Sequence, residues 1–293
     1  MKLTVLIIGC GDIGITLGRE LIDESHKVIG VRRNTAALKG TGIEPLKLDL
    51  DELDEAGASA LPQADYVIYS VSADRFEESA YQSAYPDGLK RVLSVMEQHE
   101  KPPRRVFFVS STSVYGQQEG EAVNEDSPIG PTSFSGKLMH EAEQALLNHP
   151  LPGTVVRFSG IYGPGRDRLI HQVAEGRMAA VTPVIYSNRI HRDDCTGILA
   201  HLMRCQENGQ PIAELYLGSD CEPVTLHNVM AWIGQQLKVE STDTMQSPLR
   251  RRASKRCDNQ RILETGYTFL YPSYREGYAQ ILKEGGFLEP QKA

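Results

Sequence analysis

The sequence lacks several features that would assign it to whole classes of protein. No apolar run approaches the ~18 residues that a membrane-spanning helix requires, so we expect no passage through a membrane. The five cysteines contain no C-x-x-C pair, which favours a reducing cytoplasm. Basic residues number 31 against 38 acidic ones, for a net charge of −7. We therefore expect no nucleic-acid or membrane partner.

The sequence also shows no metal-binding motif. The run HRDD at 191–194 offers ligand types, but consecutive residues on a strand-to-helix turn cannot all face one ion. We instead expect Asp193 or Asp194 to cap a helix that begins near Cys195.

Short apolar segments do alternate with amphipathic ones. The apolar segments are 3–9, 27–31, 43–48, 65–71, 104–110 and 153–158, and the helical ones are 12–24, 76–99 and 136–147. Such alternation predicts an α/β fold with a doubly wound parallel sheet that helices cover on both faces.

The alternation loosens after residue 160, which predicts two regions. Residues 1–160 would form the sheet domain, and residues 161–293 a smaller region of mixed structure that binds substrate. The helix near 193–206 is expected to return to the first region.

A glycine motif follows the first predicted strand. GCGDIG places glycines at Gly9, Gly11 and Gly14, in the strand-motif-helix order of a Rossmann fold. Gly9 would allow the tight turn, Gly11 the approach of a pyrophosphate, and Gly14 close packing of helix on strand. The pattern predicts dinucleotide binding, and the alternative is a glycine-rich turn without a ligand.

The other residues of this loop are expected to line the same site. Cys10 and Ile13 would contribute backbone N–H groups near the phosphates at the helix N-terminus. Asp12 would repel a phosphate if it pointed inward, so its expected role is to stabilise the helix N-terminus from outside.

The second predicted strand ends in VIGVRRN, where NAD-binding chains usually carry an acid. Arg32 and Arg33 stand there, and a guanidinium pairs well with a 2′-phosphate. NADP is therefore predicted over NAD, against the alternative that both arginines are solvated strand-end charges.

Four further motifs resemble those of a known protein family. They are VSSTSVYG at 109–116, RFSGIYG at 157–163, RIHRDD at 189–194 and DNQRILETGY at 258–267. With the glycine motif, they resemble the extended short-chain dehydrogenase/reductase superfamily, which includes sugar-nucleotide epimerases and dehydratases. More narrowly, the chain is similar to an atypical branch labelled NAD-dependent epimerase/dehydratase.

The resemblance implies roles for individual residues. Lys137 matches the lysine that holds the nicotinamide ribose, Ser111 the hydroxyl residue that bonds the substrate oxygen, and Asp49 the acid near the adenine. Leu50 and Ser70 complete the expected cofactor site.

The catalytic tyrosine of the superfamily has no counterpart. Ser133 occupies its place, four residues before Lys137, and a serine hydroxyl is far less acidic than a phenol with a pKa of about 10. The standard proton transfer is therefore in doubt, while cofactor binding is not.

Ser133 and several other residues are weaker candidates for the substrate end. Tyr115, Tyr162 and His191 are proton donors by type, with the alternatives that the tyrosines are wall residues and the histidine structural. Arg166 and Arg192 would favour an anionic substrate unless they are surface charges.

The sequence thus predicts an NAD(P)-dependent reductase, epimerase or dehydratase acting on a small hydroxyl or carbonyl compound, with an anionic or sugar-derived compound as one option. The rival is a non-catalytic NADP(H) sensor that lost catalysis with the tyrosine. The expected partner is a small-molecule substrate, and a homodimer is an open alternative.

Overall fold

The computed structural model describes residues 2–53, 61–245 and 254–288. The chain divides into two compact units. Unit 1 comprises Met1–Val114, Pro131–Arg157 and Thr196–Tyr216, and unit 2 comprises Tyr115–Gly130, Phe158–Cys195 and Leu217–Ala293. The sequence-based boundary at residue 160 stays a prediction. It differs from these units at residues 115–130 and 158–160, which belong to unit 2, and at residues 196–216, which belong to unit 1 and include most of the helix expected near 193–206.

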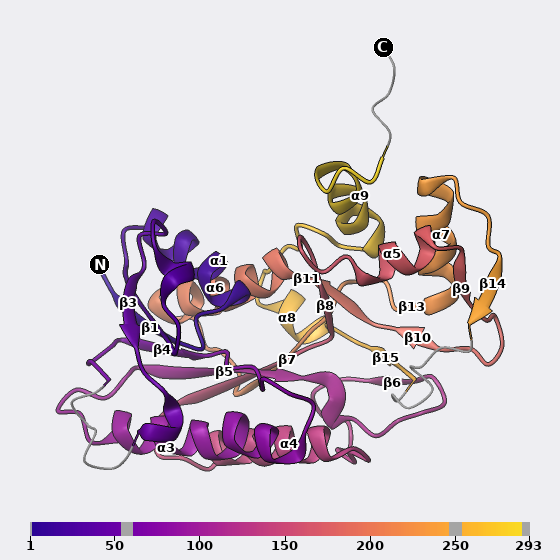
Figure 1. The fold of residues 1–293 in the computed structure, drawn as a ribbon. Helices are drawn as coiled ribbons and strands as arrows, with labels where there is room; N and C mark the ends of the chain where they lie inside the picture. Colours follow the sequence, from indigo (N-terminus) through magenta and orange to yellow (C-terminus); the bar gives the residue numbers. More distant parts are fainter. Residues whose placement is uncertain (1, 54–60, 246–253, 289–293) are drawn as a thin grey trace. The chain divides into compact units, whose positions relative to one another are not determined.

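A seven-stranded sheet forms the centre of unit 1, in the order β12-β7-β5-β4-β1-β2-β3 (Figure 1). The strands are β1 (Thr4–Ile8), β2 (Lys27–Arg32), β3 (Glu44–Lys47), β4 (Tyr66–Tyr69), β5 (Arg105–Ser111), β7 (Gly153–Phe158) and β12 (Leu215–Gly218). The pairings β1 with β2, β1 with β4, β2 with β3 and β4 with β5 are parallel. The predicted α/β fold class is confirmed, although the sequence reading missed β12.

Helices cover both faces of this sheet. Figure 1 shows α1 (Asp12–Asp23) and α6 (Arg192–Glu207) along one face, and α3 (Gly88–Glu97) and α4 (Phe134–Leu147) along the other. Both faces of β1 and β4 are therefore buried, which explains why their sequences TVLII and YVIY are apolar without alternation.

The single helix predicted over 76–99 is divided in three. It begins with α2 (Glu78–Gln82), passes through a π-helical turn at Ser83–Asp87, and continues as α3. Pro86 lies in the turn, and a proline cannot donate the backbone hydrogen bond that a regular helix requires. Unit 1 also contains the short 3-10 turns η1 (Ala36–Leu38), η2 (Leu50–Glu52) and η5 (Thr112–Val114).

Unit 2 is built from short strands and helices. They are β6 (Glu121–Val123), β8 (Gly160–Tyr162), α5 (Arg168–Ala174), β9 (Arg177–Ala179), β10 (Tyr186–Ser187), β11 (Arg189–His191), β13 (Val224–Thr225), α7 (Leu226–Leu237), β14 (Asp243–Met245), β15 (Lys255–Cys257), α8 (Gln260–Glu264) and α9 (Tyr274–Glu284). The strands form two-stranded sheets, of which β10 with β13 is antiparallel and β8 with β11, β9 with β14 and β6 with β15 are parallel.

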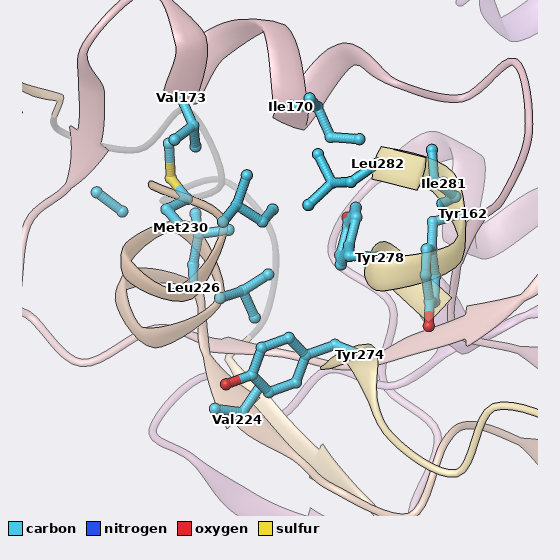
Figure 2. Close-up of a cluster of buried hydrophobic side chains, with 13 residues drawn as sticks. Tyr162, Ile170, Val173, Val224, Leu226, Met230, Tyr274, Tyr278, Ile281 and Leu282 are labelled. Carbon is cyan, nitrogen blue, oxygen red and sulfur yellow. The ribbon is translucent and has the colours of Figure 1, made fainter. Parts of the chain in front are cut away.

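The core of unit 2 lies between α7 and α9, as Figure 2 shows. Tyr162 stacks on Tyr278 with ring centroids 4.7 Å apart. A Cβ at Gly277 would lie 2.0 Å from the Tyr162 hydroxyl, so only a glycine lets α9 approach this ring. The N-terminus of α9 is stabilised by a capping box between Ser273 and Glu276.

Candidate cofactor site

The glycine loop joins β1 to α1 at the carboxyl end of the sheet. Gly9 has φ of +77°, and a Cβ there would lie 2.6 Å from the backbone of Val71. Both the backbone conformation and the available space therefore require glycine. The N–H groups of Gly9 and Cys10 donate to the carbonyl of Val31 at 3.0 and 3.1 Å, which fixes the loop against β2.

Gly11 is the N-cap of α1, and no side chain caps the helix there. A Cβ at Gly11 would meet only the Gly9 carbonyl, at 3.8 Å, so the protein's own packing does not require a glycine. The open space and the uncapped N–H groups fit a pyrophosphate at the helix N-terminus. Asp12 is the first residue of the helix and is exposed.

Gly14, the third glycine of the motif, allows α1 to pack closely on β1. A Cβ at Gly14 would lie 2.9 Å from Ile7 and 3.2 Å from the Cys10 sulfur, so glycine brings α1 close to β1. Ile13 is buried beside it, and burial raises the pKa of the Cys10 thiol to about 11. Cys10 is thus a packing residue with an unreactive thiol.

The two arginines at the end of β2 already have partners. Arg32 donates to the Cys10 carbonyl at 3.1 Å, which ties β2 to the glycine loop. Arg33 donates to both carboxylate oxygens of Asp74 at 2.6 Å. Sequence reasoning missed Asp74, which follows β4 and lies 41 residues from Arg33.

Two further predicted cofactor residues follow β3 and β4. Asp49 caps the turn η2 by accepting a hydrogen bond from the Asp51 N–H at 3.2 Å, and Leu50 begins that turn. Ser70 donates to the Gly9 carbonyl at 3.2 Å. Because parallel strands end at one edge of the sheet, these residues share an edge with the glycine loop.

Ser111 is the last residue of β5, and Lys137 lies in the first turn of α4. The Ser111 hydroxyl accepts a hydrogen bond from the Ser113 N–H at 3.2 Å. Lys137 is exposed, and its ammonium group makes no hydrogen bond or ion pair with the described residues. A Cβ at Gly136 would lie 2.5 Å from the Ser113 carbonyl, so α4 begins in close contact with the chain that follows β5.

Ser133 has a structural role in place of the missing tyrosine. It is the N-cap of α4, and its hydroxyl accepts a hydrogen bond from the Gly136 N–H at 3.1 Å. The same oxygen lies 3.0 Å from the Ser135 hydroxyl. The helix that carries Lys137 is therefore capped by the residue that replaces the phenol.

A buried ion pair fixes α4 to the sheet. Glu143 is fully buried and accepts hydrogen bonds from Arg157 at 2.8 and 2.7 Å and from the Ser110 hydroxyl at 2.6 Å. Arg157 lies on β7 and Ser110 on β5. The helix that presents Lys137 is thereby joined to two strands of the sheet.

The remaining predicted residues lie in unit 2, and three of them are buried. The Tyr115 hydroxyl donates to the Asn124 carbonyl at 2.7 Å, and that of Tyr162 to the Ser273 carbonyl at 3.4 Å. Burial raises the pKa of Tyr162 far above its usual value. Burial also lowers the pKa of His191, whose ring accepts a hydrogen bond from the Asp193 N–H at 3.2 Å.

Arg192 and its neighbours form local pairs. Arg192 donates to the Asp193 carboxylate at 3.0 Å, and Arg166 is exposed. The expected cap at Asp193 or Asp194 is wrong, because α6 begins at Arg192. The Asp194 carboxylate instead accepts hydrogen bonds from the Tyr267 hydroxyl and two N–H groups of the chain at 270–271.

In the described ranges, no three His, Cys, Asp or Glu side chains come together as metal ligands would. No helix in that part of the chain is long and apolar enough to cross a membrane.

The fold and the glycine loop define a dinucleotide-binding protein, and comparison with known proteins gives its family. The model of the NAD-dependent epimerase/dehydratase family matches residues 5–214. The chain therefore belongs to that family, and its cofactor is a nicotinamide dinucleotide.

Several individual proteins are similar to this chain. Protein YeeZ of Escherichia coli (strain K12) is 29% identical over 218 residues, which cover 70% of this chain and 74% of that protein. A NAD-dependent epimerase/dehydratase candidate from Methylobacillus flagellatus is 34% identical, with a TM-score of 0.81 over 98% of this chain and all of its own. The human epimerase family protein SDR39U1, solved with NADPH, is 20% identical, with a TM-score of 0.78 over 96% of this chain and 99% of its own.

Proposed function

We propose that the protein is an NADP-dependent reductase, epimerase or dehydratase that acts on a small hydroxyl or carbonyl compound. The observation that carries the proposal is the open space at Gly11, beside the uncapped N-terminus of α1. Among the described residues, a Cβ at Gly11 would meet only the Gly9 carbonyl, at 3.8 Å. The pyrophosphate would bind there, and the cofactor would extend along the carboxyl edge of the sheet.

Lys137 and Ser111 would serve the reacting end of the cofactor. A nicotinamide dinucleotide supplies or accepts the hydride when bound. The Lys137 ammonium has no partner among the described residues, so it is available to hold the nicotinamide ribose. The Ser111 hydroxyl would donate to the substrate oxygen, because its one hydrogen bond within the described part of the chain is accepted from the Ser113 N–H.

The proton would come from water or from a non-standard residue. Ser133 is a poor donor because its hydroxyl already caps α4 and contacts Ser135. Tyr115 is buried, and its phenol donates to a backbone carbonyl of its own unit.

Preference for NADP over NAD rests on Arg32 and Arg33. Both guanidinium groups lie at the end of β2, where the ribose 2′ position is recognised in this fold. Arg33 would exchange Asp74 for the 2′-phosphate, a dianion that makes stronger charge-assisted hydrogen bonds than an exposed carboxylate.

A second candidate function is an NADP(H) sensor without catalysis. The cap formed by Ser133 favours it, because the position of the usual acid is used for helix stability. The retention of Lys137 together with Ser111 favours the enzyme, since a binding protein has no need of the pair.

The decisive experiment is NADPH consumption with a panel of small aldehydes and ketones. Wild type, Lys137→Met and the exposed control Lys101→Met are compared, with NADPH binding measured for each by calorimetry. An enzyme should turn over in wild type and control, and Lys137→Met should lose about 10²-fold or more of that rate. Gly11→Val supplies the baseline without cofactor, because its side chain would occupy the pyrophosphate space.

Two results would change the conclusion. Turnover that survives Lys137→Met undiminished would remove the assigned role of the lysine. Tight NADPH binding without turnover in any variant would favour the sensor, and absence of NADPH binding in the wild type would overturn both candidates.

A further inference from the structure

Lys255 is a buried lysine in unit 2. It opens β15, which pairs in parallel with β6, and only 6% of its surface is exposed. In the sequence it belongs to the basic stretch LRRRASKR at 249–256, which is interpreted either as a solvated run or as a phosphate or carboxylate contact. Residues 249–253 of this stretch lie outside the described residues. Lysines are almost never buried to this degree unless a partner compensates the charge.

The surroundings hold this lysine in place. The Asn188 side chain donates to the Lys255 carbonyl and accepts from the Cys257 N–H, both at 2.8 Å. The Lys255 ammonium lies 5.9 Å from the centre of the Tyr115 ring. That ring is itself fixed, because Tyr115 is 1% exposed and its hydroxyl donates to the Asn124 carbonyl.

Among the residues that the structure describes, no carboxylate compensates this charge. Within the described part of the chain, the Lys255 ammonium makes no ion pair or hydrogen bond. Glu121 stands opposite Lys255 in the strand register, but it is exposed and its carboxylate accepts from the Glu119 N–H at 2.8 Å.

The missing partner matters because a buried ammonium is costly. Burial lowers the pKa of Lys255, with only the Cys257 thiol acting in the opposite direction. A single ring face offsets a small part of the cost of removing an ammonium from water. An ammonium has three donors and no acceptor, so its complement is an anionic acceptor group.

We propose that Lys255, seated on the face of Tyr115, is an anion-binding subsite of unit 2 that takes the carboxylate or phosphate group of a small molecule. The inference rests on the proposed function in that this group belongs to the substrate. It narrows the substrate class to acids and phosphate esters.

The test is calorimetric titration with sodium phosphate and with sodium malonate at constant ionic strength. Wild type, Lys255→Met and Lys255→Gln are compared with Lys283→Met, which removes an exposed lysine of the same unit. At least one anion should bind the wild type, with affinity at least about tenfold lower in both Lys255 variants and unchanged in the control. Tighter binding of phosphate would identify a phosphate ester, and tighter binding of malonate a carboxylic acid.

NADPH is titrated into the same samples, so that the two proposals fail separately. A wild type that binds NADPH but neither anion would overturn the subsite alone, as would anion binding that survives in both Lys255 variants. A wild type that does not bind NADPH would overturn the proposed function, whatever the anions do.

Discussion

The carboxylate of Asp74, beside Arg33, is expected to affect how strongly the protein prefers NADPH over NADH. The Arg33 guanidinium donates to both oxygens of Asp74 at 2.6 Å, and both side chains are more than half exposed. Such exposed pairs contribute about 0–1 kcal/mol, so a 2′-phosphate would displace the carboxylate. The Asp74 charge would nevertheless remain close and repel the phosphate.

We therefore predict that Asp74→Asn tightens NADPH binding by about fivefold, the equivalent of ~1 kcal/mol. NADH binding should change by less than about twofold, because NADH carries no 2′-phosphate. Calorimetric titration of both cofactors into wild type and mutant measures the difference, and Asp23→Asn is the exposed control. An equal gain for NADH would show that Asp74 does not act on the 2′ position.

At the level of residues, the sequence predicts the site residues that stand in contiguous motifs. It does not predict partners that lie far away in the sequence. The glycine loop and the arginine pair follow strands directly, so their place at the sheet edge can be inferred. Asp74 could not be found in this way, because only the strand order β4-β1-β2 brings it to Arg33. Burial of Lys255 was equally hidden, since it depends on pairing between β15 and β6.

Helix α4 connects the candidate catalytic residues to the sheet. It starts at a serine cap, presents Lys137 in its first turn, and buries Glu143 against Arg157 on β7. The sequence predicted the helix from its spacing but gave no sign of the ion pair, because the partners lie on different elements. A shift of α4 would move Lys137 away from the end of β5.

We predict that Glu143→Gln lowers the free energy of unfolding by about 3–5 kcal/mol at pH 7, because it leaves the Arg157 charge buried without its partner. Urea unfolding followed by circular dichroism measures the change. Glu141→Gln is the matched control on the same helix: it removes an exposed pair with Lys90 and should cost less than about 1 kcal/mol.

The same pair predicts a pH dependence. Burial acts to raise the pKa of Glu143, but hydrogen bonds from Arg157, His140 and Ser110 and the Arg157 charge outweigh it and hold the pKa below its usual value. A lowered native pKa contributes stability above the unfolded pKa of about 4.3 and loses it as the pH falls through the native value. The difference between wild type and Glu143→Gln should therefore persist down to about pH 5 and shrink at lower pH. A difference that stays constant down to pH 3 would contradict the assignment.

For the whole molecule, the sequence predicted the fold class, but it did not predict every strand of the sheet or the place of each strand in it. Six of the seven strands in the sheet follow from apolar runs before residue 160. The seventh, β12, has only four residues, LYLG, and lies beyond residue 160, where the alternation has loosened. That β12 pairs beside β7 is a property of the tertiary structure, which local patterns do not encode.

This late strand leads to a prediction about the smallest part of the chain that folds. The fragment 1–160 ends at the sequence-based boundary, but it lacks Thr196–Tyr216, the last segment of unit 1. It would leave the edge of β7 unpaired and expose the sheet face that α6 covers. The α6 side chains Ile198, Leu199 and Leu202 are fully buried in the full chain. We expect no cooperative thermal unfolding from this fragment, because unpaired edges and uncovered apolar faces favour aggregation.

The longer fragment 1–220 is the matched comparison, because it holds every segment of unit 1 and all of β12. It should show cooperative thermal unfolding by circular dichroism and bind NADPH, since the glycine loop, both arginines and Lys137 are present with the sheet complete. The segments Tyr115–Gly130 and Phe158–Cys195 would lack the rest of unit 2, so a lower melting temperature than that of the full chain is expected. Equal cooperativity and equal NADPH affinity in 1–160 and 1–220 would show instead that the first domain ends at residue 160 and that β12 adds nothing to its stability.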